Sequence, residues 1–123
     1  EVLFLSGTIG KIKDTLPFQG KLGAELTVEE GYASARLCTL NHLTMAKAVL
    51  GDLDRIVRVV RLVGYVNSAP GFNKAPWVVN GASDLLVELL GEEKGRHARA
   101  ALNVNELTFD APVETVLTLQ VEP

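Results

Sequence analysis

The stretch TVEEGYASARLCTLNHLTMAKAVLG, residues 27–51, carries the strongest local signal for the fold. It opens with Thr27 and, three residues later, Glu30. This is the pattern of a capping box, in which the threonine oxygen accepts a first-turn N–H and the glutamate reaches back. Apolar residues then recur close to a period of 3.6, which is typical of a helix with one buried face. Gly51 stands where a C′ glycine ends a helix. We therefore expect a long helix from about Val28 to Leu50.

The next stretch, Asp54 to Val66, allows two interpretations. Arg55, Arg58 and Arg61 recur every third residue, as a polar stripe on a helix would. The same stretch is rich in Val and Ile, which favour strands, and its apolar residues are too dense for periodicity to decide. We favour a buried central strand, with the arginines as solvated or paired surface charges rather than ligand-binding groups.

The remaining segments complete an alternating order of strands and helices. The run Val2 to Leu5 predicts a buried strand that Ser6-Gly7 ends. Loops are expected at 10–23, 67–76 and 105–112, a second helix at Trp77–Leu90 ending at Gly91, a charged turn at Glu92–Gly95, and strands at His97–Val104 and Val113–Val121. This order predicts a single α+β domain with one sheet and two helices on one face. The other sheet face is then apolar too, and a second subunit is the simplest cover for it.

Composition narrows the classes of function. The chain has 123 residues and a net charge of −3, with no basic stripe of the kind that neutralises phosphates, so we expect no nucleic-acid partner. No apolar run is long enough for a membrane span, so no membrane partner is expected. The single cysteine, Cys38, excludes an intrachain disulfide and fits a cytoplasmic location. Because the sequence opens inside an apolar run, we expect a leading segment to be missing.

Four local motifs carry a family resemblance. They are Leu5-Ser6-Gly7 after a strand, Asn80-Gly81-Ala82 opening into Ser83-Asp84-Leu85-Leu86, the stretch Arg96–Ala101 with its Arg99, and Pro112-Val113-Glu114. Together they resemble the reactive-intermediate deaminase family, RidA or YjgF, in its branch with longer loops. The resemblance implies a chorismate-mutase-like fold, with two helices on one face of a single mixed sheet, and homotrimers with ligand clefts between subunits. It also implies hydrolysis of enamines and imines such as 2-aminoacrylate to 2-oxo acids and ammonia, without a cofactor.

The resemblance assigns the two central roles to Arg99 and Glu114. A guanidinium is a planar fork of donors that fits a carboxylate, so Arg99 is expected to anchor a small carboxylate-bearing ligand. Glu114 would hold or polarise the attacking water. Arg99 could instead be a solvated strand arginine or part of an interface ion pair, and Glu114 could simply pair with an arginine. Val116 stands where a second glutamate is frequent in the family, so no relay through a second carboxylate is expected.

Four further residues are candidates for substrate binding. Ser6 and Gly7 offer a hydroxyl and backbone N–H groups, although an ordinary strand-to-loop turn explains them as well. Strand alternation places His97, Arg99 and Ala101 on one face. His97 could narrow the pocket, change charge near neutral pH, or simply pack in an interface. Ala101 would contribute its backbone N–H.

Cys38 and His42 are four residues apart on the first helix and share a face. Two ligands do not complete a zinc site, so we expect both residues in the core and no metal. Two alternatives to the deaminase remain. One is a non-catalytic small-molecule-binding or regulatory trimer; the other, less favoured, is a ribonuclease or translation inhibitor, because the chain is acidic and poor in aromatic residues.

Overall fold

In the computed structural model, which describes residues 1–123, helix α1 spans Val28–Leu50 as predicted. Thr27 Oγ1 accepts from the Glu30 N–H at 3.2 Å, and a Glu30 carboxylate oxygen accepts from the Thr27 N–H at 3.0 Å, so the capping box is complete. Gly51 ends the helix with φ 85°, a left-handed conformation that favours glycine. Local chemistry therefore defines both ends of the helix.

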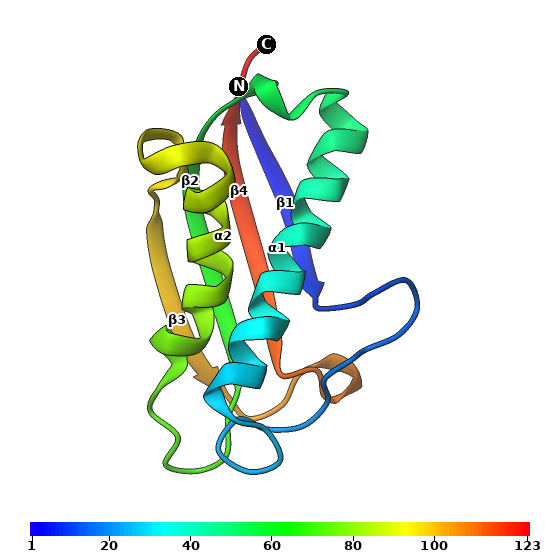
Figure 1. Cartoon of the computed structure of the whole chain (residues 1–123), viewed down its shortest axis with the longest axis vertical. Helices are drawn as coiled ribbons and strands as arrows, with labels where there is room; N and C mark the ends of the chain where they lie inside the picture. The colour runs from blue at the N-terminus through cyan, green and yellow to red at the C-terminus, as the bar shows by residue number, and fades with distance from the viewer.

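The sheet has four strands in the order β1-β4-β2-β3, and helices α1 and α2 cover one face of it (Figure 1). Strands β2 and β3 are parallel, whereas β4 is antiparallel to both of its neighbours, so the predicted mixed sheet is confirmed. Both chain ends lie at the same end of the molecule (Figure 1). The elements are β1 Val2–Ile9, α1 Val28–Leu50, β2 Ile56–Asn67, α2 Ala75–Gly95, β3 Ala98–Val104 and β4 Val113–Val121, with short 3-10 turns at Leu53–Arg55 and Thr108–Asp110.

The segment from Asp54 to Val66, which allowed two interpretations, forms strand β2 as predicted. The way β2 pairs with β4 also explains why this segment has a helix-like spacing. Ile56, Val59 and Leu62 are buried at intervals of three residues. The pairing of β2 with β4 shifts register between Ile56 and Arg58 and again between Val59 and Arg61. Each shift is a bulge that inserts one extra residue and resets which side chains face the core. Two consecutive bulges thus give a strand a period of three.

Several predicted boundaries were wrong, three of them in β1 and α2. Strand β1 does not end at Ser6-Gly7 but continues to Ile9, because a register shift between Leu5 and Thr8 absorbs these two residues as a bulge. Helix α2 begins at Ala75, with a proline in its first turn where no N–H is needed. The predicted charged turn Glu92–Gly95 is helical, although Gly91, at φ 87°, does interrupt α2 where an end was expected.

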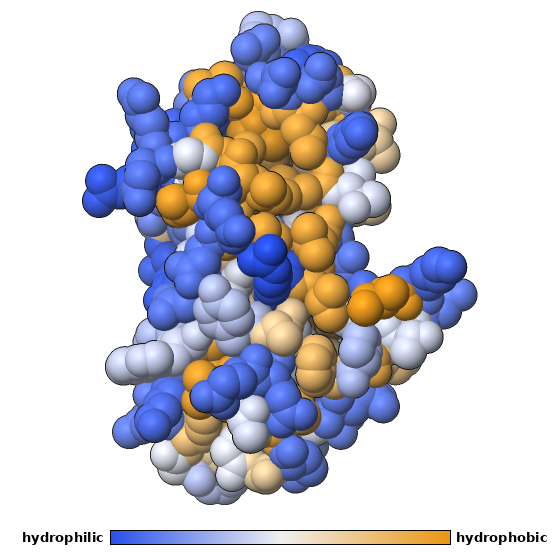
Figure 2. Space-filling view, viewed as in Figure 1, coloured by the Kyte–Doolittle hydropathy of each residue, from blue (hydrophilic) through white to orange (hydrophobic).

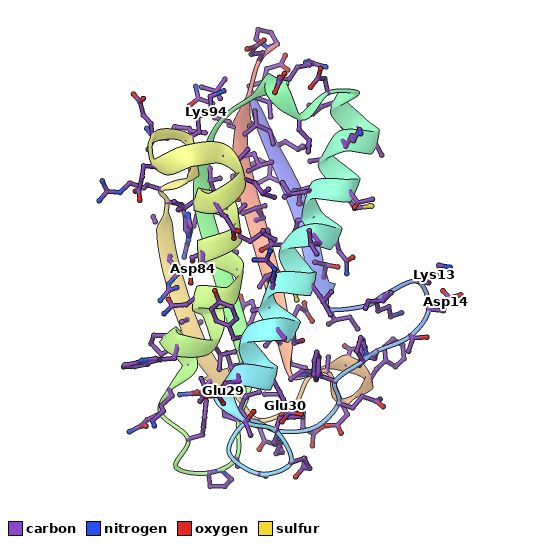
Figure 3. All side chains as sticks on the ribbon, in the orientation of Figure 1. Lys13, Asp14, Glu29, Glu30, Asp84 and Lys94 are labelled. Atoms are coloured by element: carbon purple, nitrogen blue, oxygen red, sulfur yellow. The ribbon has the colours of Figure 1, made fainter.

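A glycine allows the two helices to approach closely. A Cβ atom at Gly81 would lie 2.0 Å from the carbonyl oxygen of Tyr32, so only glycine fits where α2 meets α1. The Tyr32 hydroxyl donates to Asp84 at 2.8 Å, a contact that raises the pKa of Tyr32; Figure 3 labels Asp84 on α2. Arg36 and Glu88 form an ion pair between the same helices at 3.2 Å. These contacts hold α2, the helix that carries Asn80 and Ser83, against α1.

The core lies between the helices and the sheet, and the other sheet face is open. Figure 2, drawn from the helix side, shows apolar atoms gathered between the two helices in the half of the molecule near the chain ends. On the open face Phe4 is 77% exposed and Leu102 is 46% exposed. Neither helix combines the length and the apolar character that a membrane span requires. The fold thus leaves large apolar side chains uncovered on the sheet.

Candidate functional site

The β1 bulge places the Glu114 carboxylate directly over Gly7. Glu114 pairs with Ile9 across the β1–β4 ladder. A Cβ atom at Gly7 would lie 2.3 Å from a Glu114 carboxylate oxygen, so the side chain occupies the space that glycine leaves free. The carboxylate of Glu114 forms no ion pair within the chain, whose only ion pairs are Arg36–Glu88 and Arg96–Glu92. It is therefore free to accept a hydrogen bond from a ligand or water.

Ser6, Gly7 and Glu114 line one groove of about 820 Å³ that follows the edge strand β1 and reaches from the open sheet face to α1. Apolar side chains, including Met45 and Val49 of α1, line part of it. Lys11 and Lys13, in the loop after β1, also line the groove, and Figure 3 shows Lys13 at the outer bend of that loop. The groove thus joins an unpaired carboxylate and a serine hydroxyl to apolar walls and two cations.

Behind this groove, His42 of α1 holds the strand that carries Glu114. Its Nε2 lies 3.0 Å from the Thr115 carbonyl oxygen and 2.9 Å from Thr115 Oγ1. Burial lowers the pKa of His42 to about 4, so the ring is neutral near pH 7. Cys38 is also buried, and burial raises the pKa of its thiol to about 12. The prediction that both residues lie in the core is confirmed.

Arg99 and His97 lie in a second polar cluster, at the other edge of the sheet. Arg99 Nη1 donates to Asn80 Oδ1 at 2.8 Å and to Ser83 Oγ at 3.2 Å, and Nη2 donates to the Pro76 carbonyl at 3.4 Å. His97 Nε2 lies 2.9 Å from Ser83 Oγ, and its Nδ1 lies 2.6 Å from the Gly95 carbonyl oxygen. Ser83, His97 and Arg99 line a shallow hollow of about 320 Å³.

The alternation of side chains expected on β3 is observed, although the strand begins one residue later than predicted. Arg99 reaches toward α2 and Ala101 packs against the core, so both side chains leave β3 on the helix side. His97 contacts α2 as well, but it precedes the strand, which begins at Ala98. Ala101 pairs with Gly64 of β2 in the parallel ladder.

A single chain does not bring Arg99 and Glu114 together. Thr115 points to His42 in the core, so Glu114 beside it points to the open face, whereas Arg99 points to the helix side. Their strands are separated by β2, which places them about 10 Å apart across the sheet. Arg99 pairs with Leu62 and Glu114 with Tyr65, which separates them further along the strands. The predicted site residues therefore form two half-sites, one with Ser6, Gly7 and Glu114 and one with His97 and Arg99.

Sequence reasoning did not assign roles to Asn80, Ser83 or His42. Asn80 and Ser83 are three residues apart, a spacing that places both on one face of a helix. That spacing was a usable signal, but only the packing of α2 against β3 shows that the shared face meets Arg99. The contact between His42 and Thr115 joins residues far apart in the chain and has no local signal.

Comparisons with known proteins bear on the family and the fold of this chain. A family model described as "YjgF/chorismate_mutase-like, putative endoribonuclease" matches residues 1–116. Protein TCP17 of Trypanosoma cruzi is 50% identical over 112 residues, which cover 91% of this chain and 70% of that protein. The family match extends through both half-sites.

Two solved structures illustrate the range of the structural similarity. A protein of unknown function from Agrobacterium tumefaciens is 38% identical with a TM-score of 0.96, over 98% of this chain and 76% of that one. RidA from an Antarctic Psychrobacter species is 20% identical with a TM-score of 0.62, over 98% of this chain and 80% of that one. At that identity the second similarity concerns the fold alone.

Proposed function

This chain belongs to the YjgF/RidA family, and we propose on that premise that it hydrolyses reactive enamine and imine intermediates to 2-oxo acids and ammonia. The single observation that carries the proposal is the pair of half-sites. One presents a guanidinium suited to a carboxylate, and the other presents an unpaired carboxylate beside a serine hydroxyl. A small 2-imino acid needs both kinds of group.

We propose that a second copy of the chain unites the half-sites. Phe4 and Leu102 are exposed on the open sheet face, and burying such side chains is the usual driving force for association. A closed homotrimer would cover this face and set Arg99 of one subunit opposite Glu114 of the next. Three equivalent clefts would result.

The proposed chemistry assigns a separate task to each half-site. Arg99 holds the substrate carboxylate and so fixes the position of the adjacent imine carbon. Glu114 accepts a proton from a water whose oxygen adds to that carbon, and the nitrogen takes up a proton. The hydroxyl group of this adduct then gives up its proton and the nitrogen takes up a second one, the carbon–nitrogen bond breaks, ammonia leaves, and the carbon becomes the carbonyl of a 2-oxo acid. An enamine such as 2-aminoacrylate first becomes the imine by taking a proton on carbon.

The test is a deaminase assay with enzymatically generated 2-aminoacrylate and 2-iminobutanoate. We expect release of ammonia and the 2-oxo acid above the spontaneous rate, and a strongly reduced rate for Arg99→Ala. If wild-type protein and Arg99→Ala accelerate hydrolysis equally, the anchor role is wrong. The chain is then better described as a small-molecule-binding module of the same family.

The endoribonuclease label in the family description has less support in this chain. General acid–base cleavage by a histidine pair needs two histidines near one phosphate. The two histidines of this chain are His42 and His97. His42 is 1% exposed and engaged with Thr115, while His97 lies in the α2–β3 half-site. They cannot act on one phosphodiester within a chain.

A further inference from the structure

Arg99 is held in one orientation by three contacts within its own chain. Nη1 carries two hydrogens, and Asn80 Oδ1 and Ser83 Oγ accept them. Nη2 gives one hydrogen to the Pro76 carbonyl. A guanidinium has five N–H donors, so the Nε hydrogen and one Nη2 hydrogen have no partner in the chain. The Nε hydrogen lies on the edge of the guanidinium plane that Nε shares with Nη2, so this side-on edge keeps a donor for a ligand.

The contacts of His97 explain why Ser83 can accept from Arg99. The Gly95 carbonyl oxygen can only accept, so His97 Nδ1 carries a proton. In the neutral ring Nε2 is then an acceptor, and the Ser83 hydroxyl donates to it at 2.9 Å. With its proton directed to His97, Ser83 Oγ turns its lone pairs toward Arg99. A chain of hydrogen bonds therefore runs from Gly95 through His97 and Ser83 to Arg99.

We propose that Ser83 and His97 are positioning residues, which together with Asn80 lock Arg99 so that its Nε–H and Nη2–H edge is the one that receives the substrate carboxylate. The inference rests on the proposed function for the identity of the ligand. The locking itself rests only on the contacts within the chain. A bidentate fork binds a carboxylate well only in its own plane, so the orientation of the guanidinium sets the approach of the substrate.

Side-chain ¹⁵N NMR of Arg99 tests the locking without a ligand. In the wild-type protein, we expect separate Nη1 and Nη2 signals, because the hydrogen bonds hinder rotation about the Cζ–Nε bond. Ser83→Ala removes one of the three contacts and should broaden the two signals through faster exchange, and Ser83→Thr, which keeps the hydroxyl, should restore two sharp signals. Arg58, which is exposed and takes part in neither ion pair of the chain, serves as the freely rotating reference in the same spectra. Backbone amide spectra check that each variant is folded.

Binding of 2-oxobutanoate, a stable 2-oxo acid, tests the role of the fork. Ser83→Ala and His97→Leu should each weaken binding about three- to ten-fold, the range for loss of one hydrogen bond. The double variant should be no weaker than either single variant, because both act through one chain of contacts. In an Arg99→Ala background, Ser83→Ala should have no further effect, whereas a merely structural role would persist there.

The outcomes separate this inference from the proposed function. If Ser83→Ala leaves the Arg99 spectrum unchanged, or weakens binding equally with and without Arg99, the inference is wrong whatever the enzyme assay gives. If Arg99 is locked through Ser83 and its binding effects couple as described, the inference holds even for a protein without deaminase activity.

Discussion

At the scale of single residues, Arg99 and Gly7 meet opposite demands. In the proposed mechanism Arg99 offers a planar fork of donors, which requires that the side chain be long and its orientation fixed. Gly7 must offer no side chain at all, because the Glu114 carboxylate fills the space beside its Cα atom. Substitutions of Arg99 and of Gly7 should therefore change kcat/KM in different ways.

Removal of the Arg99 guanidinium should cost more than its replacement by another cation. We expect Arg99→Ala to lower kcat/KM by about 30- to 1,000-fold, because the carboxylate loses its charge partner. Arg99→Lys should recover only part of this loss, since an ammonium is a point charge without a fork. Steady-state kinetics on both variants checks the prediction, and equal activity of Arg99→Lys and wild type would refute the bidentate contact.

The smallest possible side chain at Gly7 should damage the site and spare the fold. In Gly7→Ala the new methyl group would displace the carboxylate of Glu114, which ends a flexible side chain and can swing away. We expect kcat/KM to fall about ten- to a hundred-fold, with a change in unfolding free energy within about 1 kcal/mol. Steady-state kinetics and urea unfolding of the same preparation measure the two effects.

Gly51→Ala is the matched control. Gly51 has φ 85°, and a Cβ atom at this position would have no neighbour within 4 Å, so this variant should lose stability through its backbone and keep its kcat/KM. Full activity of Gly7→Ala would contradict the catalytic role proposed for Glu114.

The residues of the candidate site were easier to propose from the sequence than the neighbours that orient them. Arg99, Glu114, Ser6 and Gly7 stand in local motifs that can be read without a structure. The partners that orient Arg99 come from α2, and their proximity depends on how that helix packs on β3. The displacement of Glu114 onto Gly7 depends on a bulge, which has no reliable sequence signal.

At the scale of elements, α1 contacts β4 through the imidazole of His42, whose protonation depends on pH. His42 is neutral in the folded chain because burial lowers its pKa to about 4. An unfolded chain takes up this proton at about pH 6.5. The neutral His42 ring therefore stabilises the folded chain in full above about pH 6.5, and this stabilisation is lost as the pH falls toward 4. The total loss amounts to roughly 3 kcal/mol of unfolding free energy.

Urea unfolding at fixed protein concentration, from about pH 7.5 to 4.5, measures this dependence. We expect the unfolding free energy of wild-type protein to fall more steeply with decreasing pH than that of His42→Asn, whose amide does not titrate. Carboxylates contribute equally to both curves and cancel in the difference. Parallel curves for the two proteins would show that His42 is not buried as a neutral ring.

The predictability of the elements depended on whether their signals were local. The ends of α1 followed from a capping box and a glycine, both of which act within a few residues. The helix-like spacing of β2 arose from two bulges, which exist only through pairing with β4. The extension of β1 beyond Ser6-Gly7 has the same origin. Local chemistry therefore predicted helix ends, whereas irregular strand pairing was not visible in the sequence.

At the scale of the whole molecule, charge argues against a nucleic-acid partner. The chain carries a net charge of −3, and phosphate binding requires clustered cations. We expect no salt-sensitive binding of single-stranded RNA in fluorescence anisotropy titrations. Tight binding that weakens steeply with added salt would reopen the ribonuclease interpretation.

In the proposed trimer, one chain supplies Arg99 to each cleft and its neighbour supplies Glu114. Arg99→Ala and Glu114→Gln each disable every cleft of their own trimers. A mixed trimer of the two, however, contains a cleft in which both residues are native. Random mixing of equal amounts should make about a quarter of all clefts native.

Co-refolding of the two variants, with mass spectrometry to demonstrate mixed trimers, measures this directly. We predict that deaminase activity rises from the low level of either parent to about a quarter of the wild-type value. Mixed trimers that are no more active than their parents, or a protein that stays monomeric, would contradict the shared cleft.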